Sequence, residues 1–321
     1  MKTRVAVLRG GPSSEYEVSL STGESVLSSL DKEKYESLDI FIDKNGLWHL
    51  GGVPKKPKDA LFGVDIVWNA LHGEYGEDGK VQTILEKIGV PYTGSRVAAS
   101  ALAMDKAATK KALASVGVKL AHHKIFKKDD AIVSNFGELF KIIPNPSVVK
   151  PAAAGSSVGV SIVRTFFDLP EAIESAFAVA DIIMIEEYIE GREATVGVVE
   201  KFRGKDIYAL PAIEIIPPPK DFFSYQAKYG GGSQEICPGN FSDETKNELE
   251  KLAAEIHKTL GLSHYSRSDF IVSPKRGIYF LEVNTLPGMT KESLIPKAIR
   301  AVGSDIPEFL DHVVSIARER K

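Results

Sequence analysis

Two carboxylates and one amide in the C-terminal part of the chain are spaced so that they could bind a metal ion. Glu282 and Asn284 are two residues apart, so both side chains lie on the same face of a predicted strand. A turn at residues 274–277 would fold the preceding strand back and bring Asp269 beside them. All three side chains present oxygen, which suits Mg²⁺ that shares its coordination with nucleotide phosphates. A surface hairpin with solvated acids explains the same spacing equally well.

A lysine that is followed by small residues could bind phosphate groups. The strand expected at 147–150 ends in Lys150, and the loop after it consists mostly of alanine, glycine and serine. Such a loop lets backbone amides approach phosphate closely while the lysine supplies positive charge. Lys106, at the start of a lysine-rich helix, could add a second charge. The alternatives are a plain hairpin loop and a solvated residue on a helix face.

Residues 182–193 have the pattern of a buried strand that leads into a polar hinge. Backbone groups of such a hinge can hydrogen-bond to the edge of an adenine, and an acidic side chain can bind ribose hydroxyls. An ordinary strand end is the alternative that this segment leaves open.

The elements that must position these residues begin with a predicted α/β domain over residues 1–96. Short apolar strands alternate there with residues at helical spacing, which is typical of a doubly wound sheet. The strands are expected at 4–8, 37–42 and 65–70, with a helix at 79–88.

The rest of the chain predicts two mixed α+β units, residues 97–185 and residues 186–321. The first is expected to begin with a helix at 105–116 and to continue with short strands and a helix at 169–178. The second is expected to contain strands at 194–199 and 208–216, a helix at 243–260, the hairpin and two closing helices. Between them, residues 217–239 form a long loop rich in proline, glycine and aromatic residues. Loops of more than about 20 residues are uncommon inside a compact domain, so we interpret this one as a functional lid.

Composition narrows the functional classes. The chain of 321 residues has a formal net charge of -3 and one cysteine, Cys237. The charge disfavours a general nucleic-acid binder, and a single cysteine excludes an internal disulfide. No run of about 18 apolar residues occurs, and the first residues lack the pattern of an export signal. We therefore expect a cytoplasmic protein that binds neither nucleic acid nor membrane.

Several blocks of sequence, in this order, resemble the D-alanine–D-alanine ligases of the ATP-grasp superfamily. They extend over nearly the whole chain, and the first and last of them are the most specific. The matching blocks are GGPSSEYEVSLSTG, LHGEYGEDGKVQ, PYTGS, MDKAATK, VKPAAAGSSVGV, IEEYIEGRE, YQAKY, SRSDF and LEVNTLPGMTKESLIP. The resemblance implies an ATP-grasp fold with an N-terminal doubly wound domain, the pre-ATP-grasp domain.

The resemblance also implies how ATP and two Mg²⁺ ions, or Mn²⁺ in their place, would be bound. The residues implied for the phosphates and their covering loop are Lys106, Lys150, Ser156, Ser157 and Val158. The residues implied for the adenosine are Glu186, Glu187 and Ile189 at adenine and Glu193 at ribose. The residues implied for the metal ions are Asp269, Glu282 and Asn284.

The reaction implied is the joining of two D-alanines through an acyl-phosphate, for the synthesis of peptidoglycan precursors. Glu15 would bind the ammonium of the first D-alanine, with His72 nearby, and Ser293 and Leu294 would bind the carboxylate of the second. Arg267 and the amide of Gly288 would stabilise the oxyanion, and the lid carries Lys228 and Tyr229. Tyr229 would form a hydrogen-bonded chain with Ser156 and Glu15.

Two alternatives remain open at this point. One is a related ATP-grasp ligase that uses D-lactate or another amino acid as second substrate, and Tyr229 is the residue that discriminates it. The other is a nucleotide-binding module without catalytic activity, which would have little need for Asp269, Glu282, Asn284 and Arg267 together. The resemblance further implies a homodimer.

Overall fold

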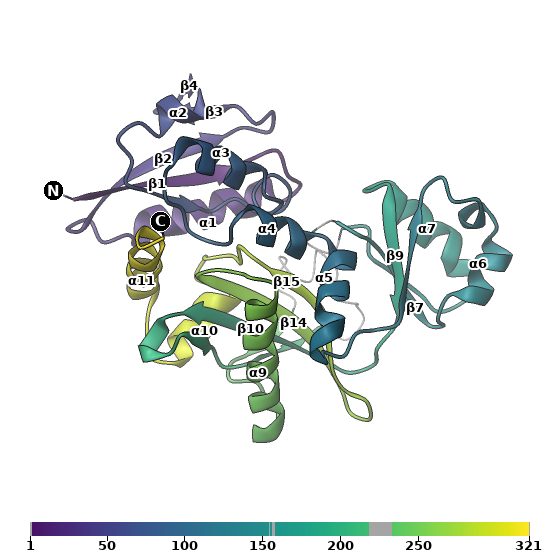
Figure 1. Ribbon diagram of the computed structural model, residues 1–321. Helices are drawn as coiled ribbons and strands as arrows, with labels where there is room; N and C mark the ends of the chain where they lie inside the picture. Colours follow the sequence, from purple (N-terminus) through teal and green to yellow (C-terminus); the bar gives the residue numbers. More distant parts are fainter. Residues whose placement is uncertain (1, 154, 156–157, 218–232, 321) are drawn as a thin grey trace.

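The computed structural model describes residues 2–153, 155, 158–217 and 233–320, and its strands form three sheets (Figure 1). The N-terminal sheet, a central sheet and a C-terminal sheet follow one another along the chain. Residues Ser156, Ser157, Lys228 and Tyr229, and most of the predicted lid, lie outside the described residues.

The N-terminal sheet has a parallel core, as the alternation of strands and helices predicts. Helix α3 (Lys80–Ile88) forms at the predicted place, α1 (Tyr16–Ser29) follows the first strand, and α2 (Pro57–Ala60) is an additional short helix. Two short antiparallel strands at the edge, residues 48–50 and 53–55, were not expected from the sequence. The order of the strands is β4 (Val53–Lys55), β3 (Trp48–Leu50), β2 (Tyr35–Ile42), β1 (Thr3–Gly10) and β5 (Ile66–Asn69).

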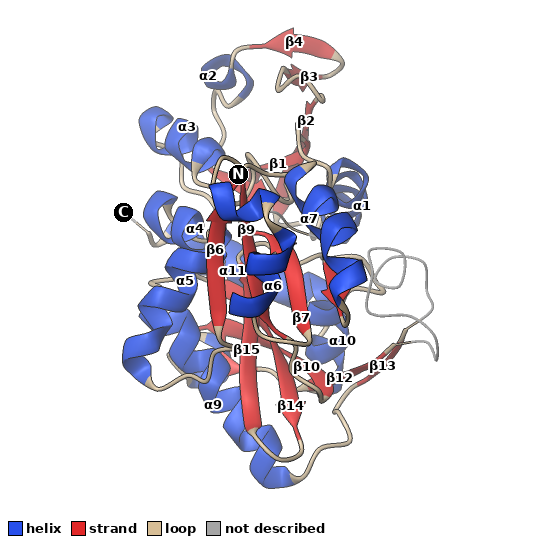
Figure 2. Cartoon of the chain, turned by 90° about the vertical axis from the view of Figure 1, so that its right-hand side faces the viewer, coloured by secondary structure: helices blue, strands red, loops and turns tan. Residues whose placement is uncertain are grey.

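The central sheet is antiparallel and is covered on one face by helices α6 (Phe136–Ile142) and α7 (Leu169–Phe177). Figure 2 shows both helices in front of this sheet. The predicted single helix is therefore accompanied by a second one, α6, whose N-terminus is capped by the side chain of Asn135. The order of the strands is β6 (His123–Lys127), β9 (Ile182–Glu187), β7 (Ser147–Pro151) and β8 (Ser161–Val163).

The C-terminal sheet corrects one expected strand. The strand expected at 208–216 is two strands, because Pro211 has no amide hydrogen to continue the ladder. The predicted loop 217–239 also contains a short strand near its end. The strands in order are β13 (Gln234–Ile236), β12 (Ile213–Ile216), β10 (Arg192–Glu200), β14 (Tyr265–Ser273) and β15 (Gly277–Asn284), and β11 (Ile207–Ala209) pairs with β10.

The other helices pack around the C-terminal sheet, and the last of them also contacts β5 and α1 of the N-terminal unit. Their bounds are α4 (Val97–Met104), α5 (Lys106–Leu113), α9 (Asp243–Thr259), α10 (Leu294–Ala301) and α11 (Ile306–Arg318). The break between α4 and α5 occurs at Asp105, whose carboxylate accepts hydrogen bonds from the amides of Ala107 and Ala108 at 2.9 and 3.0 Å. This N-cap fixes the start of α5 and thus the position of Lys106.

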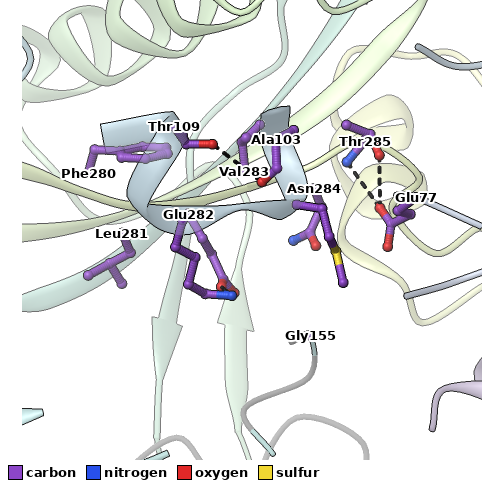
Figure 3. A pocket seen from close by; sticks show the side chains of 12 residues that line it. Glu77, Ala103, Thr109, Gly155, Phe280, Leu281, Glu282, Val283, Asn284 and Thr285 are labelled. Atoms are coloured by element: carbon purple, nitrogen blue, oxygen red, sulfur yellow. Dashed lines mark hydrogen bonds and ion pairs between the residues drawn. The ribbon is translucent and has the colours of Figure 1, made fainter. Parts of the chain in front are cut away.

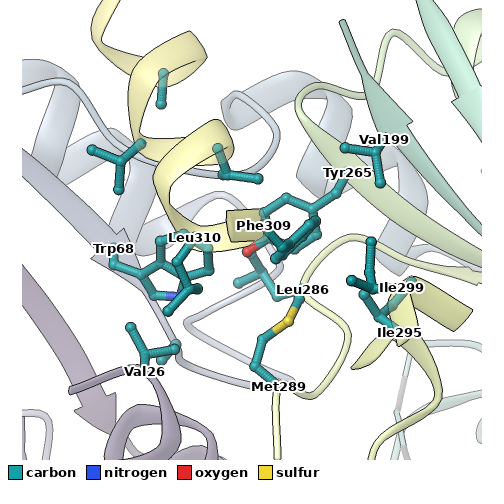
Figure 4. Packing of buried hydrophobic residues seen from close by; sticks show 14 of the residues in the cluster. Val26, Trp68, Val199, Tyr265, Leu286, Met289, Ile295, Ile299, Phe309 and Leu310 are labelled. Atoms are coloured by element: carbon teal, nitrogen blue, oxygen red, sulfur yellow. The ribbon is translucent and has the colours of Figure 1, made fainter. Parts of the chain in front are cut away.

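One hydrophobic core joins the N-terminal and C-terminal sheets (Figure 4). The ring of Trp68 in β5 stacks on that of Tyr265 in β14 at 6.0 Å, and Phe309 of α11 meets both rings edge-on. Burial of three aromatic side chains across this boundary stabilises the relative placement of the two sheets. None of the helices in the described ranges is long and apolar enough to cross a bilayer.

Candidate active site

The predicted hairpin places the metal-binding candidates side by side. In the register of β14 and β15, Asp269 lies opposite Glu282 and Arg267 lies opposite Asn284. A bulge follows Asp269, which is only 5% exposed. Two carboxylates directly opposite each other repel, so this arrangement is stable only when cations balance their charge.

The protein supplies cations to both carboxylates. The guanidinium of Arg267 donates two hydrogen bonds to Asp269, at 2.9 and 2.8 Å, and the hydroxyl of Thr195 donates a third at 2.5 Å. The ammonium of Lys106 lies 3.3 Å from Glu282. Among the described residues no group of three or more His, Cys, Asp or Glu side chains could hold a metal ion. Two carboxylates and an amide nevertheless fit Mg²⁺, because all their donors are oxygen and phosphate oxygens can complete the shell.

Two cavities meet at these residues. A small one of about 30 Å³ lies between α5, Gly155 and β15, and Figure 3 shows Glu282, Asn284 and Glu77 on its wall. A larger one of about 430 Å³ extends toward α1 and α10. Glu77, Glu282 and Asn284 line both cavities. A group bound in one cavity would therefore be adjacent to a group bound in the other.

Glu15 lies at the start of α1, on the wall of the larger cavity, and its side chain is buried. Glycines approach it from two sides. A Cβ atom at Gly73 would lie 2.7 Å from its carboxylate oxygen, and one at Gly155 would overlap the same oxygen. The loop after β7 thus reaches the N-terminal unit at Glu15, and a side chain at either glycine would displace the Glu15 carboxylate from its present position.

His72 lines the same cavity and is buried, with its Nε2 atom 2.8 Å from the hydroxyl of Thr22. Burial, and then the nearby charge of Arg267, lower the pKa of His72 to about 4. The imidazole is therefore neutral at neutral pH, so it offers one donor and one acceptor.

Glu77 is a buried carboxylate that was not among the site residues predicted from the sequence. Its Oε1 atom accepts hydrogen bonds from the amide and hydroxyl of Thr285 and from the amide of Leu286, at 3.2, 3.1 and 2.9 Å. Its Oε2 atom accepts one from the amide of Gly73 at 2.9 Å. Burial, and then the charge of Glu15, raise the pKa of Glu77 to about 7. Its place in the quoted block LHGEYGEDGKVQ was the only signal in the sequence.

The residues predicted to bind the carboxylate of the second amino acid, Ser293 and Leu294, lie at the start of α10 on the wall of the larger cavity. Ser293 occupies the N-cap position, but its hydroxyl bonds Thr290 rather than capping the helix. The first amides of α10 are thus left for another acceptor, which favours an anion. A Cβ at Gly288 would lie 2.8 Å from the hydroxyl of Ser293, so a side chain there would displace this hydroxyl. Leu294 is the first residue of the helix.

Two lysines hold Glu186 on the central sheet. Lys150 Nζ lies 2.5 Å from Glu186 Oε1, and Lys110 Nζ contacts Glu186 Oε2. Burial alone would raise the pKa of Glu186, but Lys150 and Lys110 outweigh it and lower the pKa to about 2. From the sequence, Lys150 and Glu186 were expected to make separate contacts with the nucleotide, and nothing in it indicated Lys110.

The other described residues expected at the nucleotide are Glu187, Ile189, Glu193 and Val158. The carboxylate of Glu187 pairs with Arg276 in the turn after β14, at 2.5 and 3.2 Å. Ile189 is buried, and Glu193 belongs to β10 beside β12. The amide of Val158 donates to the carbonyl of Gly155 at 3.4 Å. Their roles toward adenine, ribose and phosphate stay predictions.

Comparison with known proteins agrees with this arrangement. The family model described as D-ala D-ala ligase C-terminus matches residues 112–315, and the model for the N-terminus of the same ligases matches residues 4–60 and 51–95. The D-alanine–D-alanine ligase of Citrifermentans bemidjiense is 41% identical over 98% of this chain and 96% of its own length. That of Geobacter sulfurreducens is 39% identical over 97% and 93%.

Solved structures are similar over the whole chain as well. The VanG D-Ala:D-Ser ligase of Enterococcus faecalis superposes with a TM-score of 0.85 at 29% identity, covering 99% of this chain and all of that one. The D-alanine–D-alanine ligase of Bacillus anthracis superposes with a TM-score of 0.80 at 34% identity, covering 99% of each chain.

The three sheets and the site between them define an ATP-grasp enzyme with an N-terminal doubly wound domain, as the sequence predicts. The chain belongs to the D-alanine–D-alanine ligase family. Members of this family are ATP-dependent, ADP-forming ligases.

Proposed function

We propose that this chain joins two molecules of D-alanine to D-alanyl-D-alanine at the expense of ATP, for peptidoglycan precursor synthesis. The observation that carries the proposal is the meeting of the two cavities at Glu282 and Asn284. The larger cavity has a carboxylate, Glu15, on one wall and the start of α10 on another. These suit the ammonium of one amino acid and the carboxylate of a second.

In the first step, the carboxylate of the first D-alanine attacks the γ-phosphate of ATP. Lys106 and Lys150 offset the charge of the phosphate groups, and Ser156, Ser157 and Val158 cover them. Glu15 orients the first D-alanine through its ammonium. Neutral His72 adds no charge that would compete with that ammonium.

Asp269, Glu282 and Asn284 would hold the two Mg²⁺ ions, with Mn²⁺ as a substitute. Bound there, the ions would neutralise the charge that develops on the phosphate oxygens. Lys106 and Arg267 balance Glu282 and Asp269 in this structure. Lys106 lines the small cavity and Arg267 lines the larger one, which supports the proposed roles of both toward substrate.

In the second step, the amine of the second D-alanine attacks the acyl-phosphate and inorganic phosphate leaves. Ser293 and the amide of Leu294 bind its carboxylate at the start of α10. Arg267 and the amide of Gly288 stabilise the oxyanion of the tetrahedral intermediate. The lid over residues 217–239, with Lys228 and Tyr229, excludes the water that would hydrolyse the acyl-phosphate.

We further propose a homodimer in the cytoplasm, with units at residues 1–96, 97–185 and 186–321. The matched ranges of the two family models divide the chain close to the first of these limits. Glu186, Glu187 and Ile189 bind adenine, and Glu193 binds ribose.

A phosphate-release assay tests the function across D-amino acids, L-amino acids and D-hydroxy acids. Phosphate should be released when D-alanine is the only amino acid supplied, and mass spectrometry should find one dipeptide per phosphate. Faster release with D-alanine and D-lactate together, with depsipeptide as the main product, would favour a D-lactate ligase instead. Binding of ATP without release in any mixture would favour a module without catalytic activity.

A further inference from the structure

Lys110, Lys150 and Glu186 form an ion cluster on one face of the central sheet. The proposed reaction gives roles to Lys150 and Glu186 but none to Lys110. Val149, Ile183 and Ile185 point into the core under α6 and α7. Side chains alternate along a strand, so Lys150 and Glu186 lie on the opposite face. That face is turned toward α5, because Lys110 of α5 reaches Glu186.

The cluster has one carboxylate and two ammonium groups, all buried. Lys110 is 1% exposed and Glu186 is 3% exposed. Each lysine contacts a different oxygen of Glu186, so the carboxylate is fixed at both ends. Lys106 and Thr109, on the same helix as Lys110, line the small cavity. The cluster is therefore held by the helix that also faces the nucleotide side of the site.

A contribution to folding stability does not by itself explain why Lys110 lies beside the pair of Lys150 and Glu186. A buried pair of Lys150 and Glu186 would be neutral, whereas the added ammonium leaves a net positive charge that costs desolvation energy. Lys106 adds to the repulsion, and the pKa of Lys110 is lowered by burial first and then by Lys150 and Lys106 despite Glu186. His123 faces Glu186 from β6, and its own pKa is lowered mainly by burial. A group kept at such a cost is a candidate for a functional role.

We propose that Lys110 is a positioning residue that fixes Glu186 as a hydrogen-bond acceptor for the 6-amino group of the purine and thereby selects ATP over 6-oxo nucleotides. This rests on the proposed binding of adenine by Glu186. A carboxylate held by two ammonium groups can only accept, so a 6-amino group is bound and a 6-oxo group is repelled. When Lys150 turns toward phosphate, Lys110 still balances Glu186, which explains the need for two lysines.

The test compares ATP with ITP, which carries a 6-oxo group, in the unmodified chain and in Lys110→Met. Methionine fits the space of the lysine stem and leaves the neutral pair, so the variant should fold. Lys111→Met, an exposed position on the same helix, removes the same charge and serves as the control. The readouts are kcat and KM for dipeptide synthesis, and calorimetric Kd values for ADP and IDP.

We expect the unmodified chain and Lys111→Met to prefer ATP strongly. In Lys110→Met the preference should fall about tenfold, mainly through KM, and the ratio of the Kd values for IDP and ADP should fall equally. Equal weakening of both nucleotides in Lys110→Met, or equal use of both by the unmodified chain, would overturn the proposal. If Lys110→Met does not fold, Lys110→Gln is measured by the same criteria.

Absence of dipeptide from the unmodified chain with either nucleotide would refute the proposed function instead. The ratio of the Kd values would still decide the role of Lys110, because it requires binding only.

Discussion

Glu77 should make the stability of the protein depend on pH in a way that Glu77→Gln removes. Burial, followed by the charge of Glu15, raises the pKa of Glu77 to about 7 from its ordinary value of 4.5. Between these two pH values the folded chain binds a proton at Glu77 that the unfolded chain does not bind. Stability therefore falls as pH rises from 4.5 to 7, and stays level above both values. Glutamine does not titrate, so the variant lacks this contribution.

The size of the effect follows from the two pKa values. At 1.36 kcal/mol per pH unit, a change from 4.5 to about 7 corresponds to about 3 kcal/mol in the free energy of unfolding. The unfolding entropy of a chain of 321 residues is roughly 0.7 kcal/mol per kelvin, at about 2.1 cal/mol/K per residue. The difference between the melting temperatures of Glu77→Gln and the unmodified chain should thus shift by about 5 °C in favour of the variant as pH rises from 4.5 to 8.

Differential scanning fluorimetry of both proteins across this pH range measures the difference. Only its pH dependence is used, since glutamine also changes the hydrogen bonds to Gly73 and Thr285 by a constant amount. Glu74→Gln, at an exposed carboxylate of the same loop, is the matched control for removing one acidic charge. A flat difference for Glu77→Gln would mean that Glu77 is already ionised in the folded chain at pH 4.5, and the electrostatic reasoning would be refuted.

Three further substitutions test the proposed roles of single residues. Arg267→Ala should lower kcat about 10²- to 10³-fold with little change in ATP affinity, because the oxyanion forms only during acyl transfer; steady-state kinetics that show a change in KM alone would contradict this role. Glu282→Gln should lower ligase turnover more than about tenfold while circular dichroism stays unchanged; near-normal turnover at saturating Mg²⁺ would argue against the metal assignment. Tyr229→Phe should admit D-lactate as a detectable second substrate, by loosening a hydrogen-bonded chain with Ser156 and Glu15; an unchanged product ratio in competition, measured by mass spectrometry at several pH values, would exclude that role.

The hairpin site was predictable because its signal is local. Two residues on one strand share a face, and a turn of known type brings the neighbouring strand alongside. Asp269 and Glu282 consequently lie opposite each other as expected. The resemblance, rather than spacing, connected this hairpin with Glu15 and Ser293, which lie far away along the chain and line the same cavity.

Residues whose role depends on tertiary packing were missed. Glu77 is buried by a strand end 208 residues further along the chain, and nothing near Glu77 in the sequence predicts that contact. Lys110 has the pattern of a solvated lysine on a lysine-rich helix, and only the position of the central sheet buries it. The division of the strand expected at 208–216 into two strands was predictable, because Pro211 lies within it and has no amide hydrogen for the ladder.

The most direct test of the proposed reaction uses D-alanine labelled with ¹⁸O in its carboxylate, supplied with ATP as the only nucleotide. Attack of that carboxylate on the γ-phosphate transfers one ¹⁸O to the phosphate that leaves with the second step. The acyl-phosphate route predicts ADP, D-alanyl-D-alanine and inorganic phosphate carrying one ¹⁸O, in equal amounts. AMP and pyrophosphate, or dipeptide with unlabelled phosphate, would contradict the acyl-phosphate route.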